Sequence, residues 1–573
     1  MPRLARSGAS AGTVVNDRVD GGEAILAACR SIGIDIIFSS PGSEWAPMWE
    51  ALAHQERDGV DGPRYIDLMH ETLAVAMATG YGIVTRRPQM VLLHAVPGLL
   101  QGACGIHGAL LAQVGMVVCS SESITYGETE VDPGQQWYRN LSIVGGPQSV
   151  AAPFTKWSTQ VGSVETLYGS VVRAADIARR GPAGPVYLNV PVEVLLEPWD
   201  ADRAVVRPAP APGRRISLAS EIDDAARRVL AAQRPVIITE SAGRHPDGFD
   251  ALLEFAELLS VPVIEPPAAV STNFPRSHEL HAGAAGSELI READLIILIC
   301  CRAPWYPPSD RPAAADVLVI DEVPHRQYID YQILGADQYL EGEVGPTLRA
   351  LSATVKSAGS DEWLVAQRRE LRSAAARSAV VSTPATDTIT AADLVDALRE
   401  ALDPEASVVD ETITHSRIVA DRLQADKPGR YQYVQGGLGQ GIGVALGVKL
   451  AEPSREVALT IGDGSFLYNP IVQALAASKS LDLPILIVVI NNHQYLSMKL
   501  NHLRFYPDGA AETDQNFRGV NLHDQPSVAS LVEPFGMLGL TVTRPDELVP
   551  ALERALASVR GGTSALVDVH VAR

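Results

Sequence analysis

The sequence is poor in cysteine and has no long apolar run. Its 573 residues include five cysteines, an odd number with no Cys-x-x-Cys pair and no cysteine–histidine cluster. A zinc site is therefore not expected, and a reducing cytoplasm fits this composition. No apolar stretch reaches the length of a membrane span, and the first residues lack the apolar core of a signal peptide. We predict a cytoplasmic protein with a disordered arm over residues 1–17.

Basic residues are also in deficit. The chain has 47 lysines and arginines against 68 aspartates and glutamates, a net charge of −21. This balance argues against nucleic acid or an anionic membrane as the main partner. A chain of this length is expected to form several domains, each with its own core.

Two changes in composition divide the chain. A proline-rich stretch, VRPAPAPGRR, covers residues 206–215, and a charged segment rich in Ser, Ala and Thr follows residue 352. Within each part, short Val/Ile/Leu-rich runs alternate with alanine-rich helical stretches, which is the pattern of a parallel α/β sheet. We expect three doubly wound parallel-sheet domains at 18–200, 216–352 and 387–573, with linkers at 201–215 and 353–386.

The most informative pattern is a strand–helix–strand unit over residues 457–492. One apolar run ends in Gly462-Asp463-Gly464 and the next ends in Asn491-Asn492, with 26 residues between the two motifs. The carboxyl ends of parallel strands share one edge of a sheet, so Asp463 and Asn492 are expected to meet there. Carboxylate and amide oxygens suit Mg²⁺, and the glycines let a diphosphate approach the main chain.

These paired motifs resemble the GDG…NN signature of thiamine diphosphate (ThDP) enzymes. The domain order is similar to that of the ThDP-dependent decarboxylases and synthases, which implies a pyrimidine-binding, a middle and a diphosphate-binding domain. ThDP and Mg²⁺ are then the expected cofactors, with Asp463, Asn492 and Gln494 as metal ligands. Further cofactor contacts implied in the third domain are Gly437, Gly462, Gly464, Ser465, Tyr495 and Leu438, the last as the bulky residue that bends the cofactor.

The resemblance assigns the carboxylic acid of ThDP chemistry to the first domain. In YIDLMHETLAVAMATGYGIVTRRPQ, Glu71 follows a strand and begins a helix. The flanking residues resemble the family pattern around the glutamate that faces N1′ of the aminopyrimidine. The alternative is that Glu71 only complements the helix N-terminus.

Three residues resemble the substrate-binding set of benzoylformate decarboxylase. Ser43 lies in a Pro-Gly-Ser turn, His94 ends a strand, and His278 lies in an FPRSH loop. They are expected to hold the substrate carboxylate and move protons, and His94 has the best position. Ser43 could instead cap a helix, and His278 could be structural. His107, inside a helical stretch, is expected to pack in the core.

The loop VVDETITHSR combines features of the decarboxylases with features of acetolactate synthase. Thr412, Thr414 and His415 could donate to phosphate oxygens, or the threonines could simply lie at a helix start. Ile413 stands where the decarboxylase pattern has a hydroxyl, whereas His415 resembles acetolactate synthase. Downstream, Lys499, His502 and Arg504 could recognise an anionic group of the substrate or form a solvated helix face.

The leading hypothesis is a ThDP- and Mg²⁺-dependent decarboxylase of an aryl or branched 2-oxo acid, releasing an aldehyde. The alternative is an acetolactate synthase-like carboligase or C–C lyase. A third hypothesis is a non-catalytic binding or scaffold subunit. The presence of Glu71, Asp463 and Asn492 argues against it. FAD stays open without sequence support. The resemblance also implies a homodimer or homotetramer whose active sites are shared between subunits.

Overall fold

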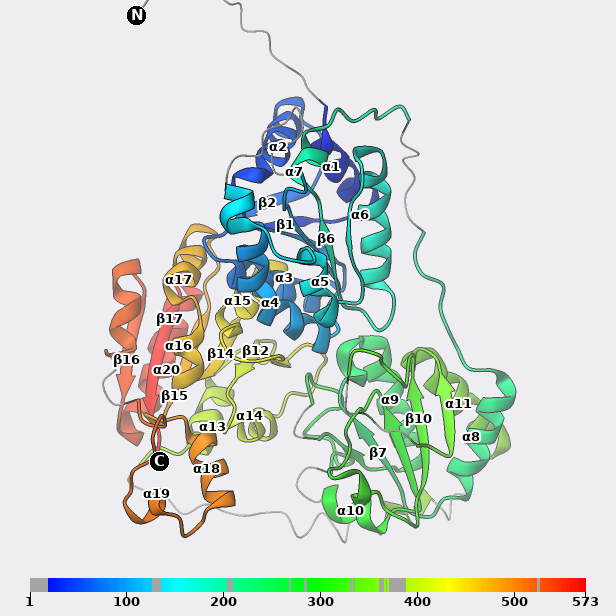
Figure 1. The fold of residues 1–573 in the computed structure, drawn as a ribbon. Coiled ribbons are helices and arrows are strands. Elements are labelled where there is room, and N and C mark those ends of the chain that lie inside the picture. Colours follow the sequence, from blue (N-terminus) through cyan, green and yellow to red (C-terminus); the bar gives the residue numbers. More distant parts are fainter. Residues whose placement is uncertain are drawn as a thin grey trace, which may run out of the picture.

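The protein folds into three parallel β-sheets, each covered by helices (Figure 1). The computed structural model describes residues 19–125, 136–203, 210–266, 269–282, 286–329, 332, 335–359, 365–366, 368–369, 388–522 and 526–572. The expected arm over residues 1–17 and parts of both expected linkers lie outside the described residues. In the described part of the chain, no helix is long and apolar enough to cross a membrane.

The first domain contains a six-stranded parallel sheet in the order β2-β1-β3-β4-β6-β5. Its strands are buried runs of Val, Ile and Leu, as expected for a sheet covered on both faces. The strands are β1 Ile36–Ser40, β2 Arg64–Asp67, β3 Gln89–Leu93, β4 Met116–Ser120, β5 Ser158–Gln160 and β6 Pro185–Asn189. The helices are α1 Gly21–Ile32, η1 Ser43–Trp45, α2 Ala46–Asp58, α3 Glu71–Thr85, α4 Val96–Leu111, η2 Trp137–Leu141, α5 Pro147–Ala151, η3 Ala152–Phe154, α6 Val164–Arg179 and α7 Val192–Leu196.

The middle domain contains a five-stranded sheet in the order β11-β10-β9-β7-β8. Its strands are β7 Pro235–Thr239, β8 Val263–Ile264, β9 Leu295–Ile299, β10 Asp316–Asp321 and β11 Gln338–Glu341. Its helices are α8 Ala219–Ala231, η4 Ala242–Arg244, α9 Pro246–Leu259, α10 Gly286–Glu292, η6 Pro308–Asp310 and α11 Val344–Ala358. Helix α11 continues past residue 352 because Leu348, Leu351 and Val355 form a buried stripe at helical spacing.

The third domain repeats the strand order of the first, in the sequence β13-β12-β14-β15-β17-β16. Its strands are β12 Ser407–Glu411, β13 Tyr431–Tyr433, β14 Val457–Gly462, β15 Leu486–Asn491, β16 Leu538–Val542 and β17 Ala565–His570. Its helices are α13 Ala391–Ala401, α14 Ser416–Leu423, α15 Gly441–Ala451, α16 Asp463–Tyr468, α17 Ile471–Ser480, α18 Leu496–Phe505, α19 Ala510–Thr513, η7 Ala529–Phe535 and α20 Pro545–Arg560. The three doubly wound domains expected from the sequence are confirmed.

Helices α3 and α15 join the first domain to the third through one continuous buried cluster (Figure 1). Their backbones approach so closely that a Cβ atom on Gly80 would lie 2.0 Å from the carbonyl oxygen of Val444. A Cβ atom on Gly447 would lie 2.1 Å from the carbonyl oxygen of Met77. Glycine at these positions therefore fixes how the two domains pack against each other.

Candidate active site

Glu71 and His94 lie together at the carboxyl edge of the first sheet. Glu71 is the first residue of α3, and the side chain of His70 caps this helix by accepting from the Thr72 N–H group at 3.2 Å. His94 follows β3 directly. A Cβ atom on Gly98 of α4 would lie 3.0 Å from Cβ of His94 and 3.2 Å from Oε1 of Glu71. The sequence-predicted pair is thus brought together, with Gly98 leaving room for both side chains.

Glu44 holds His94, and sequence reasoning missed this residue. Nδ1 of His94 lies 2.9 Å from Oε1 of Glu44, a carboxyl group that also accepts from the Ala95 N–H group at 3.0 Å. Glu44 is only 3% exposed. A carboxylate accepts and cannot donate, so Nδ1 carries the hydrogen and Nε2 is left to exchange a proton with a ligand. The hydrogen bond to Glu44 raises the pKa of His94, and the charge of Glu71 adds to this effect.

Ser43 is exposed and begins the short helix η1 at the same edge. The N-cap residue of η1 is Gly42, that of α2 is Trp45, and neither helix has a side-chain cap hydrogen bond. The alternative that Ser43 caps the following helix is therefore wrong. Ser43 is the neighbour in sequence of Glu44, the residue that hydrogen-bonds to His94.

His278 lies in the middle domain with both ring nitrogens engaged. Its Nδ1 accepts from the Leu280 N–H group at 3.1 Å, and its Nε2 lies 3.2 Å from Oε1 of Glu257. These are the contacts that a structural loop histidine makes. Ser43 and His94 belong to the first domain and His278 to the middle domain, and the role of His278 in substrate binding stays a prediction.

The second half of the site lies at the carboxyl edge of the third sheet, where β14 and β15 pair in parallel. Asp463 begins α16 directly after β14, and its Oδ1 accepts from the Gly464 N–H group at 2.8 Å. Asn492 follows β15, and its Oδ1 accepts from the Gln494 N–H group at 3.1 Å. Backbone N–H groups of residues 492–494 also approach the Asp463 carboxylate. The two strand ends therefore meet as the sequence predicted.

Asp463 carries an unpartnered acceptor that fits a cation. Its Oδ2 is buried and has no hydrogen-bond partner, and the residue is 7% exposed. Burial raises the pKa of this carboxyl despite the nearby N–H groups. Asp463, Asn492 and Gln494 would supply oxygen ligands to Mg²⁺, with diphosphate oxygens completing the set. In the described residues, no group of three or more His, Cys, Asp or Glu side chains could hold a metal.

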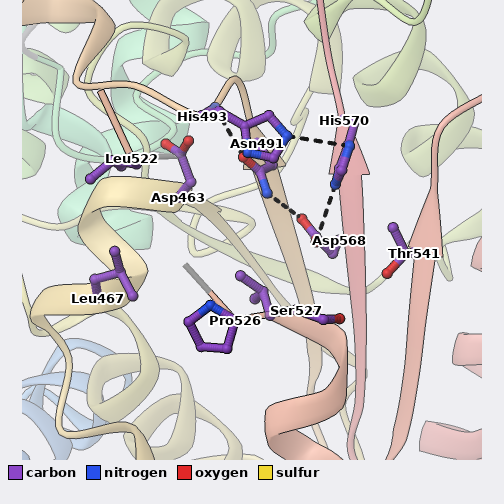
Figure 2. Close-up of a pocket in the computed structure, with 11 residues that line it drawn as sticks. Asp463, Leu467, Asn491, His493, Leu522, Pro526, Ser527, Thr541, Asp568 and His570 are labelled. Atoms are coloured by element: carbon purple, nitrogen blue, oxygen red, sulfur yellow. Dashed lines mark hydrogen bonds and ion pairs between the residues drawn. The ribbon is translucent and has the colours of Figure 1, made fainter. Parts of the chain in front are cut away.

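A polar network supports the strand end that carries Asn492 (Figure 2). Nδ2 of Asn491 donates to Oδ1 of Asp568 at 2.9 Å, and Oδ1 of Asn491 accepts from the His493 N–H group at 3.0 Å. Nε2 of His493 lies 3.3 Å from Nδ1 of His570. These side chains border a cavity of about 210 Å³ that also reaches Asp463. Sequence reasoning missed Asp568 and His570, although their alternation at the end of a buried strand was a visible signal.

Glu411 organises the start of α15, another contact not anticipated from the sequence. This buried carboxylate accepts from the Gln440 N–H group at 2.8 Å and from Nδ2 of Asn469 at 2.9 Å. Burial raises its pKa to about 7. The loop before α15 contains the partly exposed Leu438 between Gly437 and Gly439, whose φ angles are 123° and 96°. The loop can thus present backbone and an apolar side chain to a cofactor.

The remaining residues predicted to contact the cofactor differ in whether their side chains are available to bind it. The Thr412 hydroxyl donates to Oδ1 of Asp410 at 2.7 Å and is buried, so it is already committed within the protein. Nε2 of His415 is buried without a partner, as a phosphate-binding group would be. Thr414 is partly exposed in the same loop. The ring of Tyr495 covers Gly464, where a Cβ atom would lie 2.4 Å from its Cε1, and Ser465 is buried on α16.

Helices α4 and α18 both carry residues whose roles were predicted from the sequence. His107 is exposed on α4, so the expectation of a packed core residue is wrong; the core-facing side of this helix is taken by Leu99, Ile106 and Leu110. No residue of α18 is buried. Nζ of Lys499 lies 4.8 Å from the ring centroid of Phe517. Recognition of an anionic substrate group by Lys499, His502 and Arg504 stays a prediction.

Comparison with known proteins shows the family. The N-terminal TPP binding domain, the central domain and the C-terminal TPP binding domain of the thiamine pyrophosphate enzymes match residues 19–142, 222–351 and 412–569. The chain therefore belongs to the thiamine pyrophosphate enzymes, the ThDP-dependent decarboxylase and synthase family.

Individual relatives include both reaction types. Benzoylformate decarboxylase of Pseudomonas aeruginosa is 26% identical over 93% of this chain and 95% of its own. The acetolactate synthase large subunit of Corynebacterium glutamicum is 26% identical over 94% and 85%. The solved structure of the 4-hydroxybenzoylformate decarboxylase of Rhodococcus jostii RHA1 has a TM-score of 0.79 at 22% identity, covering 96% of this chain and 99% of that one.

Proposed function

We propose that the protein catalyses the ThDP- and Mg²⁺-dependent, non-oxidative decarboxylation of an aryl or branched, benzoylformate-like 2-oxo acid to an aldehyde. The observation that carries this proposal is the Glu44–His94–Glu71 cluster. It places a histidine with a fixed tautomer and a free Nε2 beside the acid expected to face the cofactor. The similarity to benzoylformate decarboxylase supports the same reaction class.

In this proposal, bound ThDP supplies the carbon nucleophile and the electron sink for decarboxylation. Glu71 exchanges a proton with the aminopyrimidine through its carboxyl group. Leu438 would pack against the cofactor. Asp463, Asn492 and Gln494 would hold Mg²⁺, and Thr414 and His415 are candidate phosphate donors.

The substrate is handled by the first domain. The Ser43 hydroxyl donates to the substrate carboxylate, and His94 delivers a proton from Nε2 to the carbon that lost CO₂. Glu44 contributes to the reaction through His94, by holding its Nδ1 hydrogen and stabilising the imidazolium form. His278 is a further candidate for binding the substrate carboxylate. The proposed reaction requires no flavin.

A carboligase or C–C lyase of the acetolactate synthase type is the second candidate. The identity to acetolactate synthase equals that to benzoylformate decarboxylase, at 26%. His415 adds a synthase-like residue near the expected phosphates. Such an enzyme would join the carbon that lost CO₂ to a second carbonyl compound, where the decarboxylase would use His94 to protonate it.

One experiment separates the two candidates. The purified protein is incubated with ThDP, Mg²⁺ and a panel of benzoylformate, 4-hydroxybenzoylformate, branched 2-oxo acids and pyruvate, while CO₂, aldehyde and 2-hydroxyketone are measured together. We expect CO₂ and aldehyde in equal amounts from an aryl or branched acid. A product mixture dominated by 2-hydroxyketone would favour the carboligase. The Glu71→Gln variant, which keeps the side-chain shape without an exchangeable acid, serves as the inactive control.

We also propose that the protein is a cytoplasmic homodimer or homotetramer. Large apolar side chains remain exposed on elements next to both halves of the site. Met69 and Leu100 are 66% and 52% exposed on the first domain, and Tyr468 and Val472 are 61% and 63% exposed on the third. Association of two chains would cover such surface and bring Glu71 of one subunit to the metal site of the other.

A further inference from the structure

A second cavity lies at the carboxyl end of β4, apart from the residues assigned to the reaction. Its volume is about 290 Å³, and its walls are Glu122, Ser123, Ile124, residues 143–148 and Gln160. Strand β4 pairs with β3, the strand that His94 follows, so the cavity lies on the same edge of the first sheet. Ala95 packs against Trp137 and Leu141, and the chain that continues from Leu141 forms one wall.

Glu122 lines this cavity and has an unsatisfied carboxylate oxygen. The residue is 3% exposed, and its Oε1 accepts from the Ile143 N–H group at 3.1 Å. Its Oε2 is buried and has no hydrogen-bond partner. Burial raises the pKa of this carboxyl. A buried carboxylate oxygen is unfavourable until a donor or a cation reaches it.

A second unsatisfied acceptor comes from Gln148. Its Nε2 donates to the Gly145 carbonyl oxygen at 3.4 Å. The side-chain carbonyl oxygen of Gln148, Oε1, is buried without a partner. None of the described residues that line the cavity is a lysine or an arginine. The side-chain atoms left unpaired are therefore acceptors, and no lining side chain supplies a positive charge.

We propose that this cavity binds the ammonium or guanidinium group of a small organic cation. Such a group carries a positive charge that can pair with Glu122, and its several N–H donors can serve Glu122 and Gln148 together. The cation could be the far end of a substrate or a separate molecule. Both sources share the same recognition chemistry, and the experiments below distinguish them.

The first experiment measures binding without turnover. Propylguanidinium and propylammonium are titrated calorimetrically into the full-length wild-type protein and Glu122→Gln. The variant keeps the acceptor for Ile143 and replaces the unpaired oxygen with an N–H₂ donor. We expect binding to weaken about tenfold or more, as for loss of a charge-assisted hydrogen bond. The matched control is Glu553→Gln, which removes the same charge from an exposed position on α20 and should bind like wild type.

Two results would overturn the proposal. Equal affinity of wild type and Glu122→Gln would remove Glu122 from the site, and absence of binding to wild type would leave a cavity that holds only water. Gln148→Met provides a second variant of similar size, and it should also weaken binding because it removes the other acceptor. Thermal unfolding of each variant establishes that it is folded before the titration is interpreted.

The second experiment identifies the source of the cation and, in this arm alone, rests on the proposed decarboxylation. It compares kcat/KM for 5-guanidino-2-oxopentanoate with that for 2-oxooctanoate, whose far end carries no charge. A loss of about tenfold in Glu122→Gln for the guanidino acid alone assigns the cavity to the substrate. Unchanged values for both acids, with cation binding lost in calorimetry, assign it to a separate molecule. Because calorimetry needs no turnover, failure of the proposed reaction leaves the binding result intact.

Discussion

At the scale of single residues, the Glu44–His94 pair makes a prediction about pH. The hydrogen bond from His94 to Glu44 raises the pKa of the imidazole, so the protonated form persists to higher pH. If protonated His94 delivers the proton, activity falls as pH rises through this pKa. In Glu44→Gln the pKa of His94 drops, and we expect the alkaline limb of the kcat profile to move down by about one pH unit.

The substitution is mild in structural terms, since the glutamine carbonyl can still accept from the Ala95 N–H group. A kcat profile across the neutral range measures the effect, and Glu50→Gln, on the exposed face of α2, is the control for loss of a negative charge. An alkaline limb that stays in place in Glu44→Gln would show that His94 protonation does not govern turnover.

His94 itself should control the fate of the reacting carbon. Removing a general acid typically slows a step by about 10²–10⁴-fold, so His94→Ala should release aldehyde that much more slowly while ThDP affinity changes little. We expect the ratio of 2-hydroxyketone to aldehyde to rise when a second aldehyde is added. Product analysis and calorimetry with ThDP measure the two effects. Unchanged aldehyde release in His94→Ala would transfer the proton step to another group.

At the scale of secondary-structure elements, the ends of β14 and β15 make a prediction about stability. Asp463 holds a buried, unpartnered oxygen, so Asp463→Asn should leave the ligand-free protein as stable as wild type or more so. The gain on adding Mg²⁺ and ThDP should disappear, whereas wild type should gain about 2.7 kcal/mol at a hundredfold excess over Kd. Thermal unfolding with and without ligands tests this, with the exposed Asp223→Asn on α8 as control. An undiminished ligand-induced gain in Asp463→Asn would exclude Asp463 as a metal ligand.

The crossing of α3 and α15 gives a paired prediction. Gly447→Ala places a methyl group against backbone atoms of Met77 and Tyr81 that cannot turn aside. Overpacking of this kind costs about 1–3 kcal/mol, so the urea midpoint should fall. Gly169→Ala is the control, because Gly169 lies exposed inside α6 with no atom within 4 Å of an added Cβ; it should stabilise the protein by about 0.4–1 kcal/mol. Equal effects of the two substitutions would contradict the close approach of the helices.

The same elements show which features of the fold and the site could be predicted from the sequence. Strand ends were predictable because apolar runs stop at Gly462 and Asn491, and parallel pairing then places Asp463 beside Asn492. The residues that support the site through long-range hydrogen bonds could not be predicted. Glu44 reaches His94 across 50 positions, Glu411 reaches Asn469 across 58, and Asn491 reaches Asp568 across 77. Such contacts depend on the order of strands in the sheet, which hydrophobic periodicity does not specify.

At the scale of the whole molecule, the two halves of the site belong to different sheets. Glu71 faces Gly98 and His94 in the first domain, whereas Asp463 faces the backbone of residues 492–494 in the third. Packing of α3 on α15 fixes these halves within each chain. The exposed apolar side chains beside both halves then favour a partner subunit as the element that completes each site.

Hybrid dimers test this arrangement. Glu71→Gln and Asp463→Ala chains are each inactive by the roles proposed for them, but a dimer containing one of each would hold one site with both residues intact. Equal mixing under subunit exchange produces hybrids in about half of the dimers, each with one working site of two, so about a quarter of wild-type activity should return. Mixing Glu71→Gln with a chain that carries both substitutions is the control, since no intact site can form. If exchange is demonstrated by differently tagged chains and activity stays absent, Glu71 and Asp463 serve the same site within one chain, and the shared-site proposal is wrong.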